Sequence, residues 1–337
     1  MRVKEAAGGS VKTFPEESKL TMKNPITRRN WLKLASVAAL GWPTFANAKT
    51  DLRAAAKKNL KLAIFSGTYS QFPVEEAARR MKADGFHGVI LEYAFADVQF
   101  NTHAPDWEAL EKMKKALAKN DLKIAALYAY YNVVDPDVER RQRGEARMNF
   151  LISNWRRFGC PIVCTETGTL NEKSEWADSP ENETEKGYLA CRAAIEKLAH
   201  AAEKSGAVIS IEAYWRNVIG SAVRAERLFH EVNSPALKLV MDPCNYFRKE
   251  ELPQMDAVLD DMFGRVGKQI VIAHAKDVKA AANGTDLPAA GKGVLDYPLF
   301  LRLLAKLDRE VFLAIEHLTF EDVPRARDYV LSQFEKI

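Results

Sequence analysis

Hydrophobic residues beyond position 58 fall into eight short runs that are separated by longer amphipathic stretches. The short runs are almost continuously apolar, which is typical of parallel strands buried on both faces. They begin near Leu60, Gly88, Leu122, Pro161, Ala207, Leu237, Gln269 and Val311. The amphipathic stretches repeat apolar residues at helical spacing, most clearly over 74–83, 107–119, 138–158, 185–205 and 297–307.

Strands that alternate with helices predict a parallel sheet covered by helices. Eight such units in about 280 residues predict a (β/α)8 TIM barrel that forms a single domain over residues 60–337. A doubly wound sheet is the structural alternative, but no GxGxxG motif follows the first strand to support its nucleotide-binding version. In a barrel of this kind, functional residues lie at the C-terminal ends of the strands.

The first 48 residues have the pattern of an export signal that precedes the folded domain. TRRNWLK at 27–33 is a twin-arginine motif, a weakly apolar stretch follows at 34–45, and Ala-Asn-Ala at 46–48 suits a signal peptidase. The apolar stretch is too short for a stable membrane anchor. We therefore predict a twin-arginine signal peptide over 1–48, with Met22 as an alternative start, and a linker over 49–59.

A twin-arginine signal implies that the twin-arginine export machinery is a partner and that the protein works in the periplasm or elsewhere outside the cytoplasm. This route carries folded proteins. It therefore suits a protein that acquires a metal ion before it crosses the membrane.

The composition is that of an ordinary globular protein, with 47% hydrophobic and 28% charged residues. The formal net charge is +4, but residues 1–48 hold eight basic and three acidic residues, so the remainder carries −1. A near-neutral body gives no electrostatic reason to expect nucleic-acid binding. The four cysteines show no CxxC or zinc-finger spacing, so we expect buried free thiols, with one disulfide as the alternative.

Four successive strands in the second half of the chain end in residue types that ligate metals. The fifth to eighth strands end at Glu212, Asp242, His274 and Glu316. Three carboxylates and an imidazole on one rim would be stabilised by a divalent cation, which also supplies a Lewis acid. One Mn²⁺, Mg²⁺, Co²⁺ or Zn²⁺ ion fits these oxygen and nitrogen donors equally well. Each residue alone could be a solvated strand end or a helix cap, so the prediction depends on the joint pattern.

The body of the chain resembles the xylose isomerase-like TIM-barrel superfamily, among the proteins called sugar phosphate isomerases/epimerases. The similar segments are FSGTYSQFPVEEAARRMKADGFHGV from 65, IEAYWRN from 211, MDPCNY from 241, AHAKD from 273, GKGVLDY from 291 and IEHLTFEDVP from 315. The resemblance covers nearly all of residues 60–334 and implies the barrel fold. It also implies that Glu212, Asp242, His274 and Glu316 are the metal ligands.

The same resemblance implies a sugar isomerase or epimerase in carbohydrate metabolism. A metal-bound hydroxycarbonyl has an acidified C–H bond, and moving its proton needs two acid–base groups. Glu212 and Glu316 resemble the paired glutamates of the family's epimerases, which would act through a metal-bound enediolate. One alternative is a metal-dependent lyase that acts on 3-keto-glycosides by β-elimination. Export favours this alternative, because phosphorylated sugars are uncommon outside the cytoplasm. The other is a periplasmic sugar-binding protein that has lost its chemistry.

Polar residues at the strand ends are candidate contacts for a small carbohydrate substrate. They are Asn245, Lys276, Arg216, Asn217, Glu92, Asn132 and Glu166. Asn245 stands where tagatose- and psicose-type epimerases have histidine, and asparagine cannot carry a proton charge, so their specificity is not expected. Six histidines in the chain also argue against the histidine-rich three-zinc site of endonuclease IV.

Three further expectations concern single residues near the strand ends. Alternation directs His317 away from the barrel interior, and we expect Trp176 to pack in a core or loop. Asp296 in GKGVLDY should cap the following helix. The sequence alone selects neither the sugar nor the metal nor one of these reactions, and it allows both a monomer and a homo-oligomer.

Overall fold

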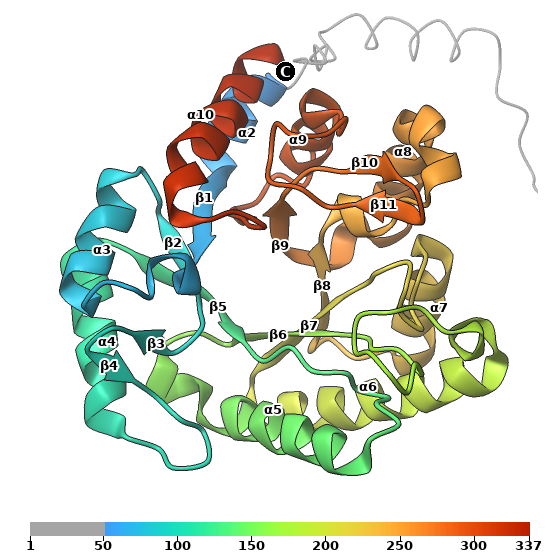
Figure 1. Cartoon of the computed structure of the whole chain (residues 1–337), viewed down its shortest axis with the longest axis horizontal. Coiled ribbons are helices and arrows are strands. Elements are labelled where there is room, and N and C mark those ends of the chain that lie inside the picture. The colour runs from blue at the N-terminus through green and yellow to red at the C-terminus, as the bar shows by residue number, and fades with distance from the viewer. Residues whose placement is uncertain (1–50) are drawn as a thin grey trace, which may run out of the picture. The chain divides into compact units, whose positions relative to one another are not determined.

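Eight parallel strands close into a barrel in the order β1-β12-β9-β8-β7-β6-β5-β2, and helices form a ring around it (Figure 1). The computed structural model describes residues 51–337, so the predicted signal peptide and the start at Met22 lie outside the described residues. The barrel strands are β1 (Leu60–Phe65), β2 (Gly88–Leu91), β5 (Lys123–Tyr128), β6 (Ile162–Glu166), β7 (Val208–Glu212), β8 (Leu237–Met241), β9 (Ile270–Ala275) and β12 (Val311–Ile315). The predicted TIM barrel is confirmed, because β1 pairs with β12 and closes the sheet.

A helix follows each barrel strand. These helices are α3 (Val74–Ala83), α4 (Trp107–Lys119), α5 (Val138–Phe158), α6 (Glu185–Ser205), α7 (Ala222–Val232), α8 (Met255–Val266), α9 (Tyr297–Ala305) and α10 (Val323–Gln333). Short 3₁₀ turns lie at η1 (Ser66–Tyr69), η2 (Pro180–Glu183), η3 (Pro243–Asn245), η4 (Lys249–Gln254), η5 (Gly267–Gln269), η6 (Phe320–Asp322) and η7 (Phe334–Lys336). Four predicted helix ranges agree to the residue, and the fifth ends at Ala305 instead of 307.

The helix boundaries follow from local capping chemistry. The side chains of Asp106, Asp137 and Thr184 accept hydrogen bonds from backbone N–H groups in the first turns of α4, α5 and α6. Gly159 and Gly206 end α5 and α6 in the left-handed conformation, which glycine adopts without steric cost. Clear caps at both ends explain why the sequence pattern located these helices accurately.

Residues 52–59 form helix α2 (Leu52–Asn59), and not the linker that was predicted over 49–59. Asp51 Oδ1 accepts a hydrogen bond from the Ala54 N–H at 3.1 Å and caps the helix. Ala56 and Asn59 are buried, and α2 packs against α9. One apolar contact face on eight residues is too short for the sequence pattern to indicate this helix, and tertiary packing stabilises it.

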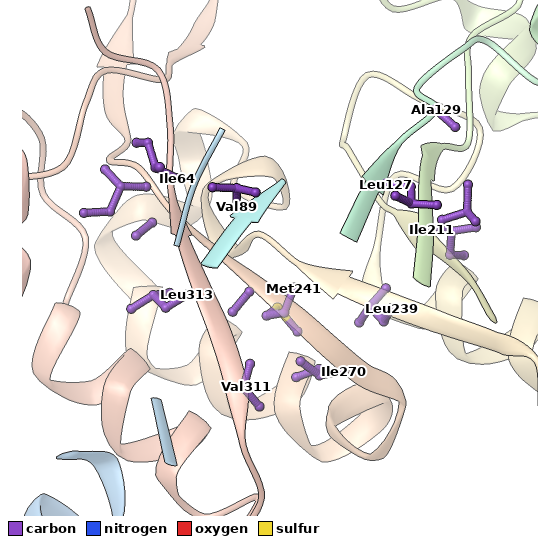
Figure 2. Packing of buried hydrophobic residues seen from close by; sticks show 14 of the residues in the cluster. Ile64, Val89, Leu127, Ala129, Ile211, Leu239, Met241, Ile270, Val311 and Leu313 are labelled. Carbon is purple, nitrogen blue, oxygen red and sulfur yellow. The ribbon is translucent and has the colours of Figure 1, made fainter. Parts of the chain in front are cut away.

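Apolar side chains fill two layers on either side of the strands. The outward-facing residues pack against the helices, and Figure 2 shows Val89, Leu127, Ile211 and Leu313 among them. Inside the barrel, smaller side chains form a second cluster that includes Ala63, Ala126, Cys164, Val240, Ile272 and Ala314. On β6, β7, β9 and β12 the inward-facing row continues beyond this cluster to a polar residue at the C-terminal mouth of the barrel.

Two small antiparallel sheets lie in the loops that follow β2 and β9. They pair β3 (Ala94–Phe95) with β4 (Val98–Gln99), and β10 (Lys279–Ala281) with β11 (Gly284–Asp286). All four cysteines are buried free thiols, as predicted. Within residues 51–337, no helix combines the length and the apolar character that crossing a membrane requires.

Candidate metal centre

Glu212, Asp242, His274 and Glu316 meet at the C-terminal end of the barrel. One ligand atom from each of the four lies within 4.8 Å of the others. His274 Nδ1 is 3.5 Å from Glu212 Oε2, 3.7 Å from Asp242 Oδ2 and 3.5 Å from Glu316 Oε2. The strand-end pattern seen in the sequence therefore corresponds to one cluster in space.

The unpartnered polar atoms of this cluster fit a divalent cation. Both ring nitrogens of His274 lack a hydrogen-bond partner although the side chain is buried. Buried polar atoms in folded proteins almost always have partners. Three carboxylates and one imidazole, aimed at a common point, form a donor set that suits Mg²⁺, Mn²⁺, Co²⁺ or Zn²⁺.

Lys276 places a positive charge beside the cluster. Its Nζ lies 2.6 Å from Asp242 Oδ2 and 2.8 Å from Glu316 Oε1. The Lys276 ammonium therefore makes close ion pairs with both carboxylates. Burial alone would lower the pKa of Lys276, but the Asp242 and Glu316 carboxylates raise it well above its usual range. Lys276 therefore stays charged and balances part of the acidic charge.

The acidic and basic groups of the cluster shift one another's pKa values. Burial alone would lower the pKa of His274, but the facing carboxylates of Glu316 and Glu212 raise it well above its ordinary value. Burial also opposes the ionisation of Glu316, yet Lys276 and His274 hold its pKa well below the usual range. Burial raises the pKa of Asp242, an effect that Lys276 partly offsets. A cation that binds here must therefore displace the proton of His274.

A cavity of about 450 Å³ opens at the cluster, within the size range of small-molecule sites. Glu212, Glu316 and Lys276 contribute to its lining. The remaining lining residues are Phe65, Tyr128, Tyr130, Glu166, Trp176, Tyr214, Arg216, Asn217, Asn245, Leu287 and His317. The structure thus brings five of the seven predicted substrate contacts to one cavity, together with the two predicted ligands Glu212 and Glu316.

Two neutral side chains hold the Glu212 carboxylate. Asn245 Nδ2 donates a hydrogen bond to Glu212 Oε1 at 2.6 Å, and the Tyr130 hydroxyl donates to Oε2 at 2.5 Å. Burial opposes the ionisation of Glu212, but His274 holds the pKa of Glu212 below its ordinary value. Glu212 is therefore an oriented carboxylate that faces the cavity.

The carboxyl group of Glu166 has a raised pKa, in contrast to that of Glu212. It is paired in register with Glu212 on the neighbouring strand, and its Oε2 accepts a hydrogen bond from Asn217 Nδ2 at 3.2 Å. Burial raises the pKa of Glu166 to about 8. A pKa raised this far favours the protonated form at neutral pH, which makes Glu166 a candidate proton donor in the cavity.

The other predicted contacts differ in their position. Arg216 lines the cavity, and its guanidinium lies 4.7 Å above the Trp215 ring. Glu92 lines an adjoining cavity that Glu316 also borders, and its Oε2 accepts a hydrogen bond from the Gly67 N–H at 2.6 Å. Arg216 therefore borders the same cavity as the candidate ligands, and Glu92 borders the adjoining one.

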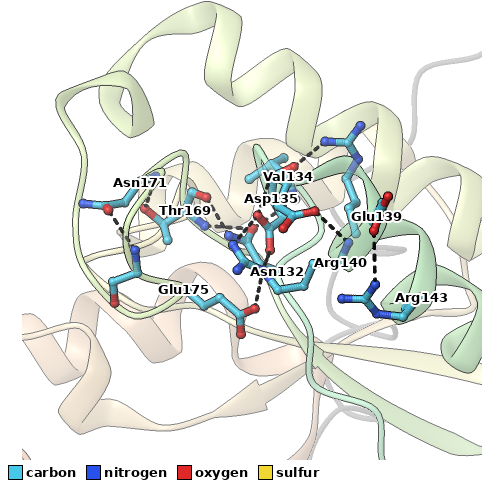
Figure 3. Close-up of polar contacts among 12 residues, drawn as sticks. Asn132, Val134, Asp135, Glu139, Arg140, Arg143, Thr169, Asn171 and Glu175 are labelled. Carbon is cyan, nitrogen blue, oxygen red and sulfur yellow. Dashed lines mark hydrogen bonds and ion pairs between the residues drawn. The ribbon is translucent and has the colours of Figure 1, made fainter.

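Asn132 is not brought to the cavity. Its side chain donates to the Thr169 carbonyl at 2.7 Å and accepts from the backbone N–H groups of Thr169 and Val134, both at 3.1 Å. Figure 3 shows this network, which ties the loop after β5 to the loop after β6. With these three bonds the Asn132 amide supports the loops, and nothing in its geometry supports substrate contact.

Sequence reasoning missed several residues that line the cavity. Tyr128 and Tyr130 stack at 4.9 Å between ring centroids, and the alternation from Ala126 onward could have placed both on the inner face. His317 was predicted to point away but lines the cavity, because its left-handed backbone, with φ of 58°, interrupts the strand alternation. Trp176, predicted to be a packing residue, is 55% exposed at the cavity.

Comparisons with known proteins agree with the barrel fold. A search of curated proteins finds no match. A xylose isomerase-like TIM barrel protein from Mycobacterium smegmatis, solved in complex with magnesium, is 18% identical with a TM-score of 0.60, over 83% of this chain and 98% of that protein. The IOLI protein with a bound zinc atom is 16% identical with a TM-score of 0.60, over 82% and 98%.

A third similar structure is 3-keto-D-glucoside 4-epimerase from E. coli, in its apo form. It is 15% identical with a TM-score of 0.59, over 83% of this chain and 99% of the epimerase. At such identities the three likenesses show the fold. Residues 76–331 match the family model described as xylose isomerase-like TIM barrel, which spans more than half of the sequence. This chain therefore belongs to the xylose isomerase-like TIM barrel family.

Proposed function

We propose that this protein is a divalent-metal-dependent sugar isomerase or epimerase that moves a proton next to a carbonyl group. The observation that carries the proposal is the pair of glutamates, Glu212 and Glu316, that flank His274 and line one cavity. Together with Asp242 these residues would hold the cation. A bound divalent cation supplies Lewis-acid stabilisation of the negative charge that develops on the substrate oxygen.

The two glutamates differ in their partners and therefore in their roles. Asn245 and Tyr130 orient Glu212, whose lowered pKa keeps it ionised and able to accept a proton from carbon. Glu316 lies beside Lys276, which can share a proton with it or bind a substrate oxygen. Proton removal by one glutamate and proton return by the other gives epimerisation or isomerisation, according to the carbon that receives the proton.

A lyase that acts on 3-keto-glycosides by β-elimination is the second candidate. Such a reaction needs the same proton removal, followed by protonation of a leaving oxygen. Glu166, with its pKa raised to about 8, is a protonated acid in the same cavity and could supply that second proton. The structural likeness to a 3-keto-D-glucoside epimerase makes this substrate class a reasonable choice for testing.

We also propose that the protein is exported through the twin-arginine machinery and acts outside the cytoplasm. The support is the ordered set of TRRNWLK, an apolar stretch and Ala-Asn-Ala in residues 27–48. An extracytoplasmic setting favours unphosphorylated sugars and glycosides as substrates.

Deuterium exchange tests the enzymatic proposal directly. Metal-loaded protein is incubated in D₂O with a panel of sugars and 3-keto-glycosides, and carbon-bound deuterium is located by NMR. We expect incorporation next to a carbonyl in at least one substrate, and the product separates epimerase, isomerase and lyase. Binding without any exchange would instead favour a sugar-binding protein.

Glu212→Gln and Glu316→Gln test the two roles. Each change should lower turnover by roughly 10²–10⁴-fold, the usual contribution of general acid–base catalysis. Glu139→Gln, at a side chain that is 88% exposed on α5, is the matched control. Metal content is measured in the same samples, and wild-type turnover in both metal-replete variants would contradict the mechanism.

A further inference from the structure

Trp176 is a large aromatic side chain exposed at the mouth of the candidate site. It lies in the loop between β6 and α6, and 55% of its surface is accessible to solvent. It borders the cavity that also contains Glu212, Asn245 and Lys276, which are 6%, 5% and 3% exposed. The cavity therefore has a buried polar end and an exposed aromatic end.

The residues on both sides of Trp176 are fixed by contacts with other parts of the protein. Glu175 Oε1 pairs with Arg140 Nε at 2.5 Å, and Arg140 Nη2 also donates to Asp135 Oδ1 at 2.7 Å (Figure 3). On the other side, Thr169 Oγ1 donates to the Ala177 carbonyl at 2.7 Å. Trp176 is thus flanked by two anchored residues, and an anchored platform loses little conformational freedom when a ligand binds.

Asn171 strengthens the same loop between these anchors. Its Oδ1 accepts hydrogen bonds from the Lys173 and Ser174 N–H groups at 2.9 and 3.1 Å, and its Nδ2 donates to the Asp178 carbonyl at 2.8 Å. Three bonds from one side chain give the loop a defined shape. These hydrogen bonds fix the position of Trp176 relative to the cavity.

We propose that Trp176 forms an outer subsite that binds the second group of a glycoside. The sugar ring that reacts would lie among the polar residues at the buried end, and a second pyranose ring or an aromatic aglycone would stack on the indole. Both groups present a flat face with little hydrogen-bonding capacity, which an indole ring contacts favourably. The inference rests on the proposed function for the placement of the reacting ring. It narrows the substrate class from free monosaccharides to glycosides.

Equilibrium binding tests the subsite without relying on turnover. The affinities of metal-loaded protein for methyl β-D-glucoside, cellobiose and p-nitrophenyl β-D-glucoside are measured by calorimetry. We expect the wild type to bind one or both of the two-group ligands more tightly than methyl glucoside. Trp176→Ala should reduce that preference by about 3- to 10-fold, as expected for the loss of one aromatic stacking contact. The ligand that loses affinity distinguishes a sugar from an aromatic aglycone.

Two further variants control the experiment. Trp176→Phe keeps an aromatic face and should restore part of the preference, whereas Leu189→Ala removes an exposed apolar side chain on α6 and should leave it unchanged. A wild type that binds none of the three ligands, or all three equally, would overturn the subsite. Equal weakening of all three by Trp176→Ala would do the same. If no substrate exchanged deuterium but the binding preference were intact, the catalytic proposal would be overturned and the subsite would stand.

Discussion

His274 is the candidate ligand at which a proton would compete with a metal ion. Its pKa is raised by the facing carboxylates of Glu316 and Glu212, although burial acts in the opposite direction. Only the neutral imidazole can ligate a cation, so metal binding must release the proton. The charge balance of the cluster therefore depends on both pH and metal.

We expect the wild type to hold about one divalent ion per chain and both His274→Ala and Asp242→Ala to lose it. Because the pKa of His274 is raised, the apparent metal affinity should fall on acidification, by up to about tenfold per pH unit for one displaced proton. Elemental analysis and metal titration at several pH values measure both effects. His230→Ala, at an exposed residue of α7, is the control. Full metal retention in both variants would refute the ligand assignment.

Glu166 should make the stability of the fold depend on pH. Its pKa is raised from 4.5 to about 8 by burial, so the folded protein keeps a proton that the unfolded chain releases. The unfolding free energy of the wild type should therefore decrease as pH rises from about 4.5 to 8.

Glu166→Gln removes this titration. Its unfolding free energy relative to the wild type should increase across that pH window, by roughly 1–3 kcal/mol. Urea denaturation at pH 5 and pH 8 in the presence of a chelator provides the measurement. Wild-type and variant stabilities that change in parallel would show that Glu166 is ionised in the folded protein.

At the scale of elements, the loop between β9 and α9 is organised by Asp277, the residue after Lys276. Asp277 accepts backbone hydrogen bonds from Val278, Gly291 and Leu295, each at 2.9 Å. As predicted, Asp296 caps α9, accepting from the Leu299 N–H at 2.9 Å. The GKGVLDY segment therefore has a structural role that supports the placement of Lys276.

Gly293→Ala should disrupt this loop. A Cβ at Gly293 would lie 2.4 Å from both Asp277 Oδ1 and the Val278 carbonyl, which is too close for either to remain in place. We expect a loss of about 1–3 kcal/mol in the free energy of unfolding, as for other overpacked sites, measured by urea denaturation.

Gly264→Ala in α8 is the matched control, because a Cβ there would meet nothing within 4 Å. Replacing a helical glycine by alanine should stabilise the protein by about 0.5–1 kcal/mol. If both variants were stabilised, the loop after β9 would have more room than its contacts indicate.

At the scale of the whole molecule, we propose that the basic N-terminal segment directs export, whereas the near-neutral barrel carries the candidate site. Arg28→Lys combined with Arg29→Lys should leave the precursor in the cytoplasm, because the twin-arginine pathway reads the arginine pair. Cell fractionation followed by immunoblotting shows where the protein lies and whether it is processed. Arg2→Lys, outside the motif, should be exported normally. If the double variant were found processed outside the cytoplasm, the proposal of a twin-arginine signal would be refuted.

The sequence alone determined the barrel and the four residues of its candidate metal centre. Strands such as Leu60–Phe65 and helices such as Val138–Phe158 could be located because burial and capping act over a few neighbouring residues. Alternation along strands also directed Glu212, His274 and Glu316 to the inner face. Since every strand of a parallel barrel ends at the same rim, local patterns were enough to predict that these residues meet.

Only the tertiary structure decided which other residues join them. Barrel closure and loop conformation brought Tyr130, Trp176 and His317 to the cavity, and the same loops kept Asn132 away from it. Packing against α9 turned residues 52–59 into a helix. These outcomes depend on contacts between segments far apart in the chain and on single backbone angles. Hydrophobic periodicity is a local pattern and predicts neither of them.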